Sequence, residues 1–403
     1  MKKIITFVFI ALLAVGCSKN NMSSLDQQGD TITVGAFLSL TGQWATLGKT
    51  SEAALDLATK EINNYFQSGG SQTRVAVKIY DTKLDAATAL DALKEAHKQG
   101  IRFIIGPQSS GECSQLLDYA NKNNMIIISQ GSTAGALSIP GDNLFRYCPD
   151  EKLEAAAEAK AIFSDGIRAI VTIALDDVGN KGLQQSLDNA FGALGGQVYS
   201  LNPYAANTTD FSSVISDINS QLTAAINQYG ADKVGVYIAC FDEGVNLFAQ
   251  AVNDTVLTSV NWYGGDGIAN SEALAANSTA AAFALSTHFT TPAFALPDDA
   301  KSIWKSLSDK IVQKTGIQPT AFGLASYDAL WTVSLTYEAT QGDGHSWDNA
   351  KKMFAKQSDM YFGATGATKL NANGDRALAS FGFWEMIQDN NGYSWKLMRI
   401  VTP

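Results

Sequence analysis

Short apolar runs alternate with longer amphipathic segments along most of the chain. The run "TITVGAFLSL" precedes "KTSEAALDLATKEINNYF", where Leu55, Ala58, Ile62 and Tyr65 recur at spacings of three, four and three. That spacing predicts one apolar stripe along a helix. The pairs "VAVKIYD" with "AATALDALKEAHKQ" and "IRFIIG" with "GECSQLLDYANKNN" repeat the pattern, and "MIIIS" closes the set. Strands alternating with helices in this way predict a parallel sheet with right-handed crossovers.

A second series of the same kind begins after "FRYCPDEK". It contains the apolar runs "RAIVTIALDD", "KVGVYIACFD" and "VNWYGGDG", each separated from the next by a helical stretch. Residues 290–355 look mostly helical, and the tail alternates like a hairpin around the turn signals "NANGD" and "DNNGY". The pattern therefore predicts an α/β protein with two doubly wound parallel-sheet lobes. The length of 403 residues, 46% of them hydrophobic, agrees, because single cores usually split above about 250–300 residues.

The N-terminus has the layout of an export signal. "MKKIITFVFIALLAVGCSKN" places two lysines before an apolar stretch too short for the roughly 20 residues of a membrane span. We expect residues 1–16 to be removed as a signal peptide, and "AVGC" resembles the lipobox in which the cysteine, here Cys17, is lipidated. Residues 17–30 would then be a polar tether to the membrane.

The charge and the cysteines exclude several classes of function. Loss of Lys2 and Lys3 with the signal peptide changes the net charge from -10 to -12, which argues against nucleic acid as a partner. Cys113, Cys148 and Cys240 permit at most one intramolecular disulfide, and the sequence does not choose the pair. Their spacing fits no metal site, and no motif calls for a cofactor.

Polar residues gather where the predicted strands end, which is where open parallel sheets bind ligands. The first lobe offers hydroxyls and helix N-termini in "GPQSSG" and "SQGSTAG", which suit an anion such as a carboxylate. The second lobe offers carboxylates in "LDDVGNKG", "ACFDEG" and "YGGDG", which suit a cation. Two facing lobes with this division predict a site for a zwitterion, such as the backbone of an amino acid.

Each of these residues also has a simpler interpretation. Ser109 and Ser110 suit helix capping, Ser132 and Thr133 suit a turn, and Asp266 suits a glycine-rich turn. An alternative function is a hydrolase that uses Asp266 with Ser110 or Thr133. It is disfavoured because none of the three histidines lies in a suitable context and no G-x-S-x-G, H-E-x-x-H, G-x-G-x-x-G or P-loop sequence is present.

Motifs along nearly the whole mature chain resemble the type I periplasmic solute-binding proteins of the branched-chain amino-acid-binding kind. They include "IIGPQSSG", "IISQGSTAGAL", "FRYCPD", "YGGDGIAN" and "GATGATKLNANGDRA". The resemblance implies two α/β lobes joined by hinge strands that close on a ligand, with no chemistry performed. We expect residues 31–149 with about 290–360 to form the first lobe, and 150–289 with about 361–403 to form the second.

The resemblance also implies roles for individual residues. Ser110 with Ser109, and Ser132 with Thr133, match the positions that hold an amino acid's carboxylate, while Asp266 matches the partner of its α-ammonium. Trp44 and Phe241 match aromatic residues that cover the ligand from either lobe. Gly179 and Asn180 stand where family members commonly have Tyr-Gly, and "STAG" replaces the frequent Thr-Ser-Pro. Because of these two differences, the resemblance does not imply which side chain the ligand has.

The sequence thus predicts an exported, lipid-anchored protein that captures a small zwitterion, an amino acid, for an ABC-type permease. A sensor-linked receptor of the same fold and a surface lipoprotein with a degenerate cleft are the alternatives.

Overall fold

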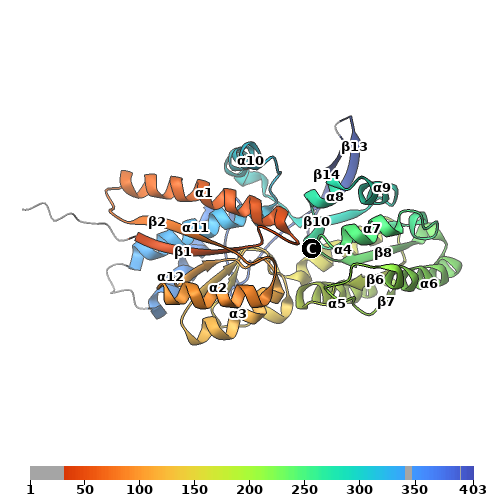
Figure 1. Cartoon of the computed structure of the whole chain (residues 1–403), viewed down its shortest axis with the longest axis horizontal. Helices are drawn as coiled ribbons and strands as arrows, with labels where there is room; N and C mark the ends of the chain where they lie inside the picture. Colours follow the sequence, from red (N-terminus) through yellow and green to blue (C-terminus); the bar gives the residue numbers. More distant parts are fainter. Residues whose placement is uncertain (1–30, 341–346, 391) are drawn as a thin grey trace, which may run out of the picture.

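Two separate sheets, one in each lobe, organise the chain along its long axis (Figure 1). The computed structural model describes residues 31–340, 347–390 and 392–403. The expected signal peptide, Cys17 and the tether lie outside these residues. Within the described ranges, no helix combines the length and apolar character that a membrane crossing requires.

The first sheet has five strands in the order β2-β1-β3-β4-β5, all parallel. Its strands are β1 (Thr31–Leu38), β2 (Arg74–Asp81), β3 (Phe103–Ile105), β4 (Ile126–Ser129) and β5 (Leu144–Arg146). The helices of this lobe are α1 (Ala45–Ser68), α2 (Ala86–Lys98), α3 (Ser110–Lys122), α10 (Lys301–Thr315), α11 (Ala321–Thr340) and α12 (Trp347–Met360).

Strand β1 shows why the apolar runs are continuous. Val34 and Leu38 pack into the core formed with α1 and α11, whereas Phe37 packs into the core formed with α2 and α3. All three side chains are fully buried. A parallel strand covered by helices on both faces is apolar at most positions, and β1 is apolar without interruption from Val34 to Leu38.

The predicted apolar stripe on α1 is confirmed for its first three residues, and the prediction is wrong for the last one. Leu55, Ala58 and Ile62 are at most 1% exposed, but Tyr65 is 58% exposed and Phe66 is 3% exposed. The next buried position after Ile62 is therefore four residues on rather than three. The ring of Tyr65 instead lies against Trp331 of α11, with ring centroids 5.5 Å apart.

The second sheet has seven strands in the order β14-β13-β10-β9-β8-β6-β7. Its strands are β6 (Ala169–Ala174), β7 (Gln197–Ser200), β8 (Val234–Ala239), β9 (Asn261–Gly264), β10 (Thr290–Phe294), β13 (Phe381–Asp389) and β14 (Gly392–Val401). Its helices are α4 (Glu151–Ser164), α5 (Val178–Ala193), α6 (Ser212–Tyr229), α7 (Gly244–Ala251), α8 (Glu272–Ala276) and α9 (Ser278–Ser286). β13 and β14 form the expected hairpin and are antiparallel, while β6 to β10 are parallel.

Short elements complete the chain. They are β11 (Phe362–Gly363), β12 (Gly366–Ala367) and the 3₁₀ turns η1 (Gly135–Leu137), η2 (Ala231–Lys233), η3 (Leu257–Ser259), η4 (Asp266–Ile268) and η5 (Asp298–Ala300).

The chain changes lobes at positions that differ in part from those expected. β10 pairs with β9 and β13 in the second sheet, so residues 290–294 are not part of the first lobe. Residues 362–376 contact the first lobe instead, because Ala364 donates its backbone N–H to Asp328 of α11 at 2.8 Å and Asp375 pairs with Arg146 of β5. The crossings follow β5, follow β10 and precede β13.

Candidate functional site

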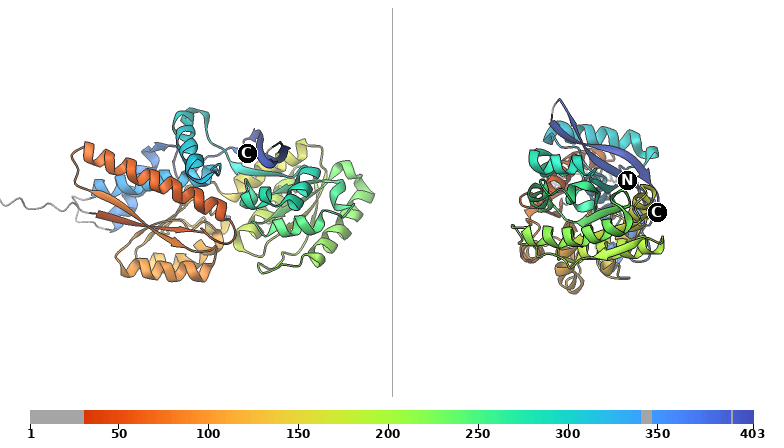
Figure 2. Two further views of the ribbon diagram at one scale, coloured as in Figure 1. Left: turned by 45° about the horizontal axis from the view of Figure 1, so that its top comes forward. Right: turned by 90° about the vertical axis from the view of Figure 1, so that its right-hand side faces the viewer.

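The candidate loops from both lobes meet between the two sheets. In each sheet the strand order reverses at one point, with β1 between β2 and β3, and β6 between β7 and β8. Loops leave such neighbouring strands in opposite directions, which opens a crevice at their carboxyl ends. These ends face the other lobe (Figure 2).

Ser110 is the first-lobe serine that faces the loop after β4. Its Oγ lies 2.9 Å from Ser132 Oγ and accepts a hydrogen bond from the backbone N–H of Ala134 at 3.2 Å. Ser110 is also the first residue of α3, where backbone N–H groups and the helix dipole favour an anion. The pair of hydroxyls and the helix N-terminus together form a group of donors suited to a carboxylate.

Ser109, in contrast, is held by its own helix. Its Oγ accepts from the backbone N–H of Glu112 and donates to Glu112 Oε2 at 2.7 Å, which forms a capping box. Thr133 uses its carbonyl to accept the backbone N–H of Glu151 at 2.8 Å, at the first crossing between lobes. The two serines of "SSG" therefore have different environments.

Arg146 fixes the loop that carries Ser132, and sequence reasoning did not single it out. It is fully buried and donates to the carbonyls of Ala134 at 2.6 Å and Ser132 at 3.3 Å. Its Nε lies 2.5 Å from Asp375 Oδ1, so a buried ion pair holds the guanidinium. The only signal was an arginine directly after the apolar pair "LF" in "FRYCPD", a place where a charge is unusual.

Asp266 lies in η4, directly after β9 of the second sheet. It is 7% exposed, and its Oδ2 has no hydrogen-bond partner among the described residues. Its backbone N–H donates to Glu154 Oε1 at 3.0 Å. Burial raises the pKa of the Asp266 carboxyl to about 6. A cationic group brought to this oxygen would restore the charged form.

The glycines beside Asp266 permit close packing of its loop. A Cβ at Gly265 would lie 2.6 Å from Leu183 Cδ2, and a Cβ at Gly267 would lie 2.6 Å from the carbonyl oxygen of Cys240 and 2.7 Å from the Phe241 ring. All three distances are far below van der Waals contact. The glycines thus seat the Asp266 loop against its neighbours in the second lobe.

Three further carboxyl groups accompany Asp266, and all were missed in the sequence. Glu151, Glu154 and Glu158 lie along α4 and are at most 5% exposed. Each has one carboxyl oxygen without a hydrogen-bond partner in the described part of the chain. Burial raises the pKa of Glu151 to about 7; burial and the nearby Asp266 raise the pKa values of Glu154 and Glu158 well above the usual range. Acidic residues spaced three and four apart on a helix usually mark its solvated face, which is why they were overlooked.

Trp44 and Phe241, which we expected to pack over the ligand from the first and the second lobe, contact each other. Their ring centroids are 4.8 Å apart, and the backbone N–H of Trp44 donates to Asp242 Oδ2 at 2.9 Å. The cavity beside them, which Asp266 and Phe322 also line, measures about 10 Å³, about the room of one water molecule. The lobes are therefore closed, and the two rings must separate to admit an amino acid.

Gly179 and Asn180 occupy the positions where family members commonly have Tyr-Gly, so the tyrosine ring is absent here. A Cβ at Gly179 would lie 3.3 Å from both Cβ and Oγ of Ser110 in the other lobe. Asn180 instead joins the start of α5, since its backbone N–H and side chain both bond to Asp177. The glycine lets α5 approach the serine hydroxyls closely.

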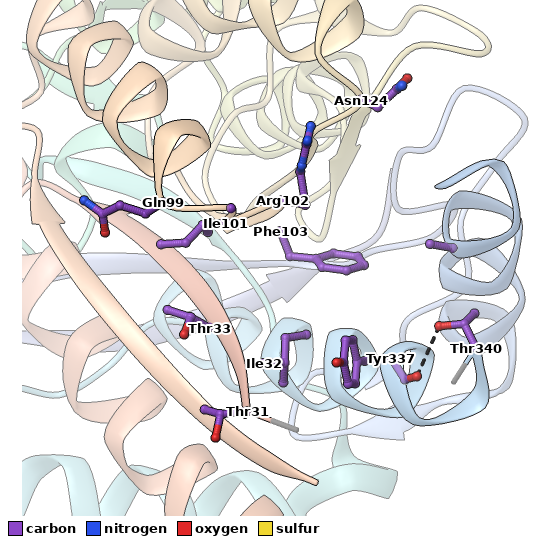
Figure 3. Close-up of a pocket in the computed structure, with 12 residues that line it drawn as sticks. Thr31, Ile32, Thr33, Gln99, Ile101, Arg102, Phe103, Asn124, Tyr337 and Thr340 are labelled. Atoms are coloured by element: carbon purple, nitrogen blue, oxygen red, sulfur yellow. Dashed lines mark hydrogen bonds between the residues drawn. The ribbon is translucent and has the colours of Figure 1, made fainter. Parts of the chain in front are cut away.

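A larger cavity of about 480 Å³ lies elsewhere, at the amino ends of the first-lobe strands. Figure 3 shows Ile32, Phe103 and Tyr337 around it, with Thr340 bonded to the carbonyl of Tyr337. Ligand sites of open parallel sheets lie at the opposite, carboxyl ends. We therefore place the candidate site between the lobes.

The hydrolase alternative finds no support in this geometry. The partners of Ser110 Oγ are Ser132 and Ala134. His97 Nδ1 lies 2.9 Å from the Tyr119 hydroxyl, between α2 and α3, and His345 lies outside the described residues.

Cys113, Cys148 and Cys240 are all buried and free, so no disulfide joins them. Among the described residues, no group of histidine, cysteine and acidic side chains has the arrangement of a metal site.

Comparison with known proteins identifies the family. A family model described as periplasmic binding protein matches residues 31–381. An uncharacterized protein of Methanocaldococcus jannaschii is 28% identical, over 98% of this chain and 94% of its own length. A Leu/Ile/Val-binding protein of Rhizobium johnstonii is 27% identical, over 74% of this chain and 77% of its own length.

Solved structures show the same fold. A leucine-binding protein from Thermotoga maritima superposes with a TM-score of 0.75 at 20% identity, over 92% of this chain and 99% of the other. A solute-binding protein of R. palustris in complex with benzoate gives 0.73 at 16% identity, over 93% and 97%. The two-lobed α/β fold expected from the sequence is confirmed, and the family is one of non-enzymatic, extracytoplasmic binding proteins. The chain belongs to the periplasmic binding protein family, in its type I, branched-chain amino-acid-binding group.

Proposed function

We propose that this protein captures an amino acid between its lobes and delivers it to an ABC-type permease in the membrane. The observation that carries the proposal is the pairing of unlike groups at the lobe interface. Ser110, Ser132 and the N-terminus of α3 offer donors on one side, and the unpartnered carboxyl oxygen of Asp266 offers an acceptor on the other. An amino acid carries a carboxylate and an ammonium and so fits both sides at once.

The relatives support this choice of ligand class. The Rhizobium relative is named for binding leucine, isoleucine and valine, and the Thermotoga structure for binding leucine. The benzoate complex shows that the fold also holds a carboxylate without an ammonium. A carboxylate is thus common to the ligands named for these proteins, and Asp266 is the group that would select for the ammonium here.

Binding and closure would be one event. Trp44 and Phe241 touch only when the lobes are together, so they would cover a bound ligand from both sides. A ligand that contacts both lobes stabilises the closed state, and the permease would recognise that state. Lipidation of Cys17 would keep the protein at the membrane beside its partner.

A thermal-shift screen of the mature protein tests the proposal. The panel contains the common amino acids and matched compounds that lack either the ammonium or the carboxylate. A ligand at about 100 times its Kd stabilises the folded protein by about 2.7 kcal/mol, which raises Tm by several degrees. Stabilisation by amino acids alone supports the proposal; stabilisation only by compounds without an ammonium contradicts it.

The membrane anchor is tested separately. We expect the wild-type protein to fractionate with membranes and the Cys17→Ser variant to be released. Equal partition of both proteins would refute lipidation without affecting the ligand assignment.

A further inference from the structure

The row of acidic residues on α4 exceeds what one ammonium group requires. Glu151, Glu154 and Glu158 are spaced three and four residues apart, so they lie on one face of the helix, and Glu154 bonds to the backbone of Asp266. With Asp266, which lines the cavity between the lobes, they make a group of four buried carboxyls in the second lobe. Asp266 alone would be sufficient for an α-ammonium.

No basic side chain in the described part of the chain pairs with these carboxyl groups within 4 Å. Arg146, which lowers the pKa of Glu151 from a distance, is itself paired with Asp375. Asp150 and Asp177 add further negative charge near Glu151 and Asp266. Unpaired carboxylates are costly to bury, so a cluster of this kind is neutral through protonation or paired by a bound cation.

Tyr237 provides a second, independent observation. This residue of β8 is fully buried, and its hydroxyl has no hydrogen-bond partner among the described residues. Burial, together with the nearby Glu158, Glu154 and Asp266, raises the pKa of Tyr237 well above the usual range. A Cβ at Gly265, next to Asp266, would lie 3.1 Å from that hydroxyl oxygen. A polar atom of this kind, buried without a partner beside the unpaired carboxyls, indicates a place for a ligand group.

We propose that the ligand carries a second cationic group, an ammonium or guanidinium, which binds between Glu154 and Glu158 while Asp266 binds its α-ammonium. The Tyr237 hydroxyl oxygen completes the surroundings of that group as an acceptor. The ligand class is then an amino acid with a cationic side chain. This inference rests on the proposed function, because it adds a second contact to the same cleft.

The proposal distinguishes compounds of nearly equal shape. Lysine and norleucine share the α-amino acid group and the unbranched side chain, but only lysine has a terminal ammonium. Cadaverine keeps two ammonium groups and lacks the carboxylate that the first lobe would hold. We expect calorimetry to show that lysine binds at least about tenfold more tightly than norleucine and than cadaverine, where tenfold corresponds to about 1.4 kcal/mol.

Proton release gives a readout that does not depend on affinity alone. Burial and the nearby Asp266 keep Glu154 and Glu158 protonated in the unliganded protein, and these protons pass to the buffer when the cationic side chain binds between the two groups. The measured enthalpy of lysine binding should therefore vary with the ionisation enthalpy of the buffer, and more strongly than that of norleucine.

Variants separate this inference from the proposed function. Glu154→Gln and Glu158→Gln should each reduce the preference for lysine over norleucine by about tenfold. Asp188→Asn is the matched control, because this second-lobe carboxyl already bonds to Thr172 Oγ1 at 2.8 Å, and it should leave the preference unchanged. Binding of norleucine or leucine as tight as that of lysine overturns the second cationic contact and leaves the amino-acid function standing. Failure of every amino acid to bind overturns both.

Discussion

Replacing Asp266 with asparagine removes one negative charge from the cleft and nearly preserves the shape of the side chain. The carboxyl is 7% exposed, and its Oδ2 makes no hydrogen bond within the described residues. The bond from its backbone N–H to Glu154 does not depend on the side chain. We therefore expect Asp266→Asn to fold normally and to lose affinity for amino acids.

The size of the loss follows from the burial of the site. A hydrogen bond to a charged group contributes about 1.5–3 kcal/mol, and leaving one charge of a buried pair without its partner costs about 3–5 kcal/mol. Because about 1.4 kcal/mol corresponds to a factor of ten, affinity should fall by between about tenfold and a few thousandfold.

The same substitution should stabilise the unliganded protein at neutral and alkaline pH. Burial raises the pKa of Asp266 from 3.8 to about 6, so the folded state holds the proton more tightly than the unfolded state. Protonated Asp266 therefore favours folding at low pH, and this contribution is lost as pH rises from about 4 to about 6. Above that range, the charged group costs on the order of 3 kcal/mol, a penalty that asparagine does not have.

Two measurements check the reasoning. Isothermal calorimetry with the amino acid that gives the largest thermal shift measures the affinity, and thermal unfolding without ligand at about pH 4 and about pH 8 measures the stability. The variant should bind poorly, unfold at a higher temperature than wild type near pH 8, and match wild type near pH 4. Wild-type affinity in Asp266→Asn would refute the role of Asp266 in binding the ammonium.

Four further substitutions test other parts of the site. Ser110→Ala should weaken amino-acid binding by about tenfold in calorimetry, whereas Ser109→Ala should lower the free energy of unfolding by about 1 kcal/mol through loss of a helix cap and leave affinity unchanged. Trp44→Ala should weaken ligand binding and expand the liganded protein in small-angle scattering, because its ring joins the lobes; an unchanged radius of gyration would contradict this. Arg146→Met should lower the free energy of unfolding by about 3–5 kcal/mol in denaturant titration, since Asp375 is left buried without its partner; a loss below 1 kcal/mol would argue against that ion pair.

The fold was predictable because fully buried parallel strands have a plain signature. Strands such as β1, β6 and β8 are apolar at nearly every position and are bounded by polar turns. β10 was missed because "TTPAF" contains Pro292 and two threonines within a stretch that otherwise looked helical. Its pairing with β9 and β13 depends on contacts that no local pattern reports.

The site was predictable to the level of its loops and less so at individual side chains. Loops at the carboxyl ends of strands must lie near one another in a doubly wound fold, which brings Ser132 and Asp266 to the same interface. Whether a serine caps its helix or faces the cleft depends on one side-chain rotation, and Ser109 and Ser110 differ in this respect. The residues of α4 were missed for another reason, since a helix covered by the second lobe and a helix facing water can carry the same acidic spacing.

The acidic residues at the lobe interface also connect the charge of the ligand to closure of the lobes. Glu151 and Asp266 lie at the interface, where closure without ligand removes their carboxyl groups from water and favours the protonated forms. Deprotonation at neutral pH makes that burial costly, so the charged groups oppose closure. A bound cation removes the penalty and thereby favours the closed state over the open one. The acidic groups then act in two ways: they contribute to affinity for cationic ligands, and they make closure on such a ligand more favourable than closure without it.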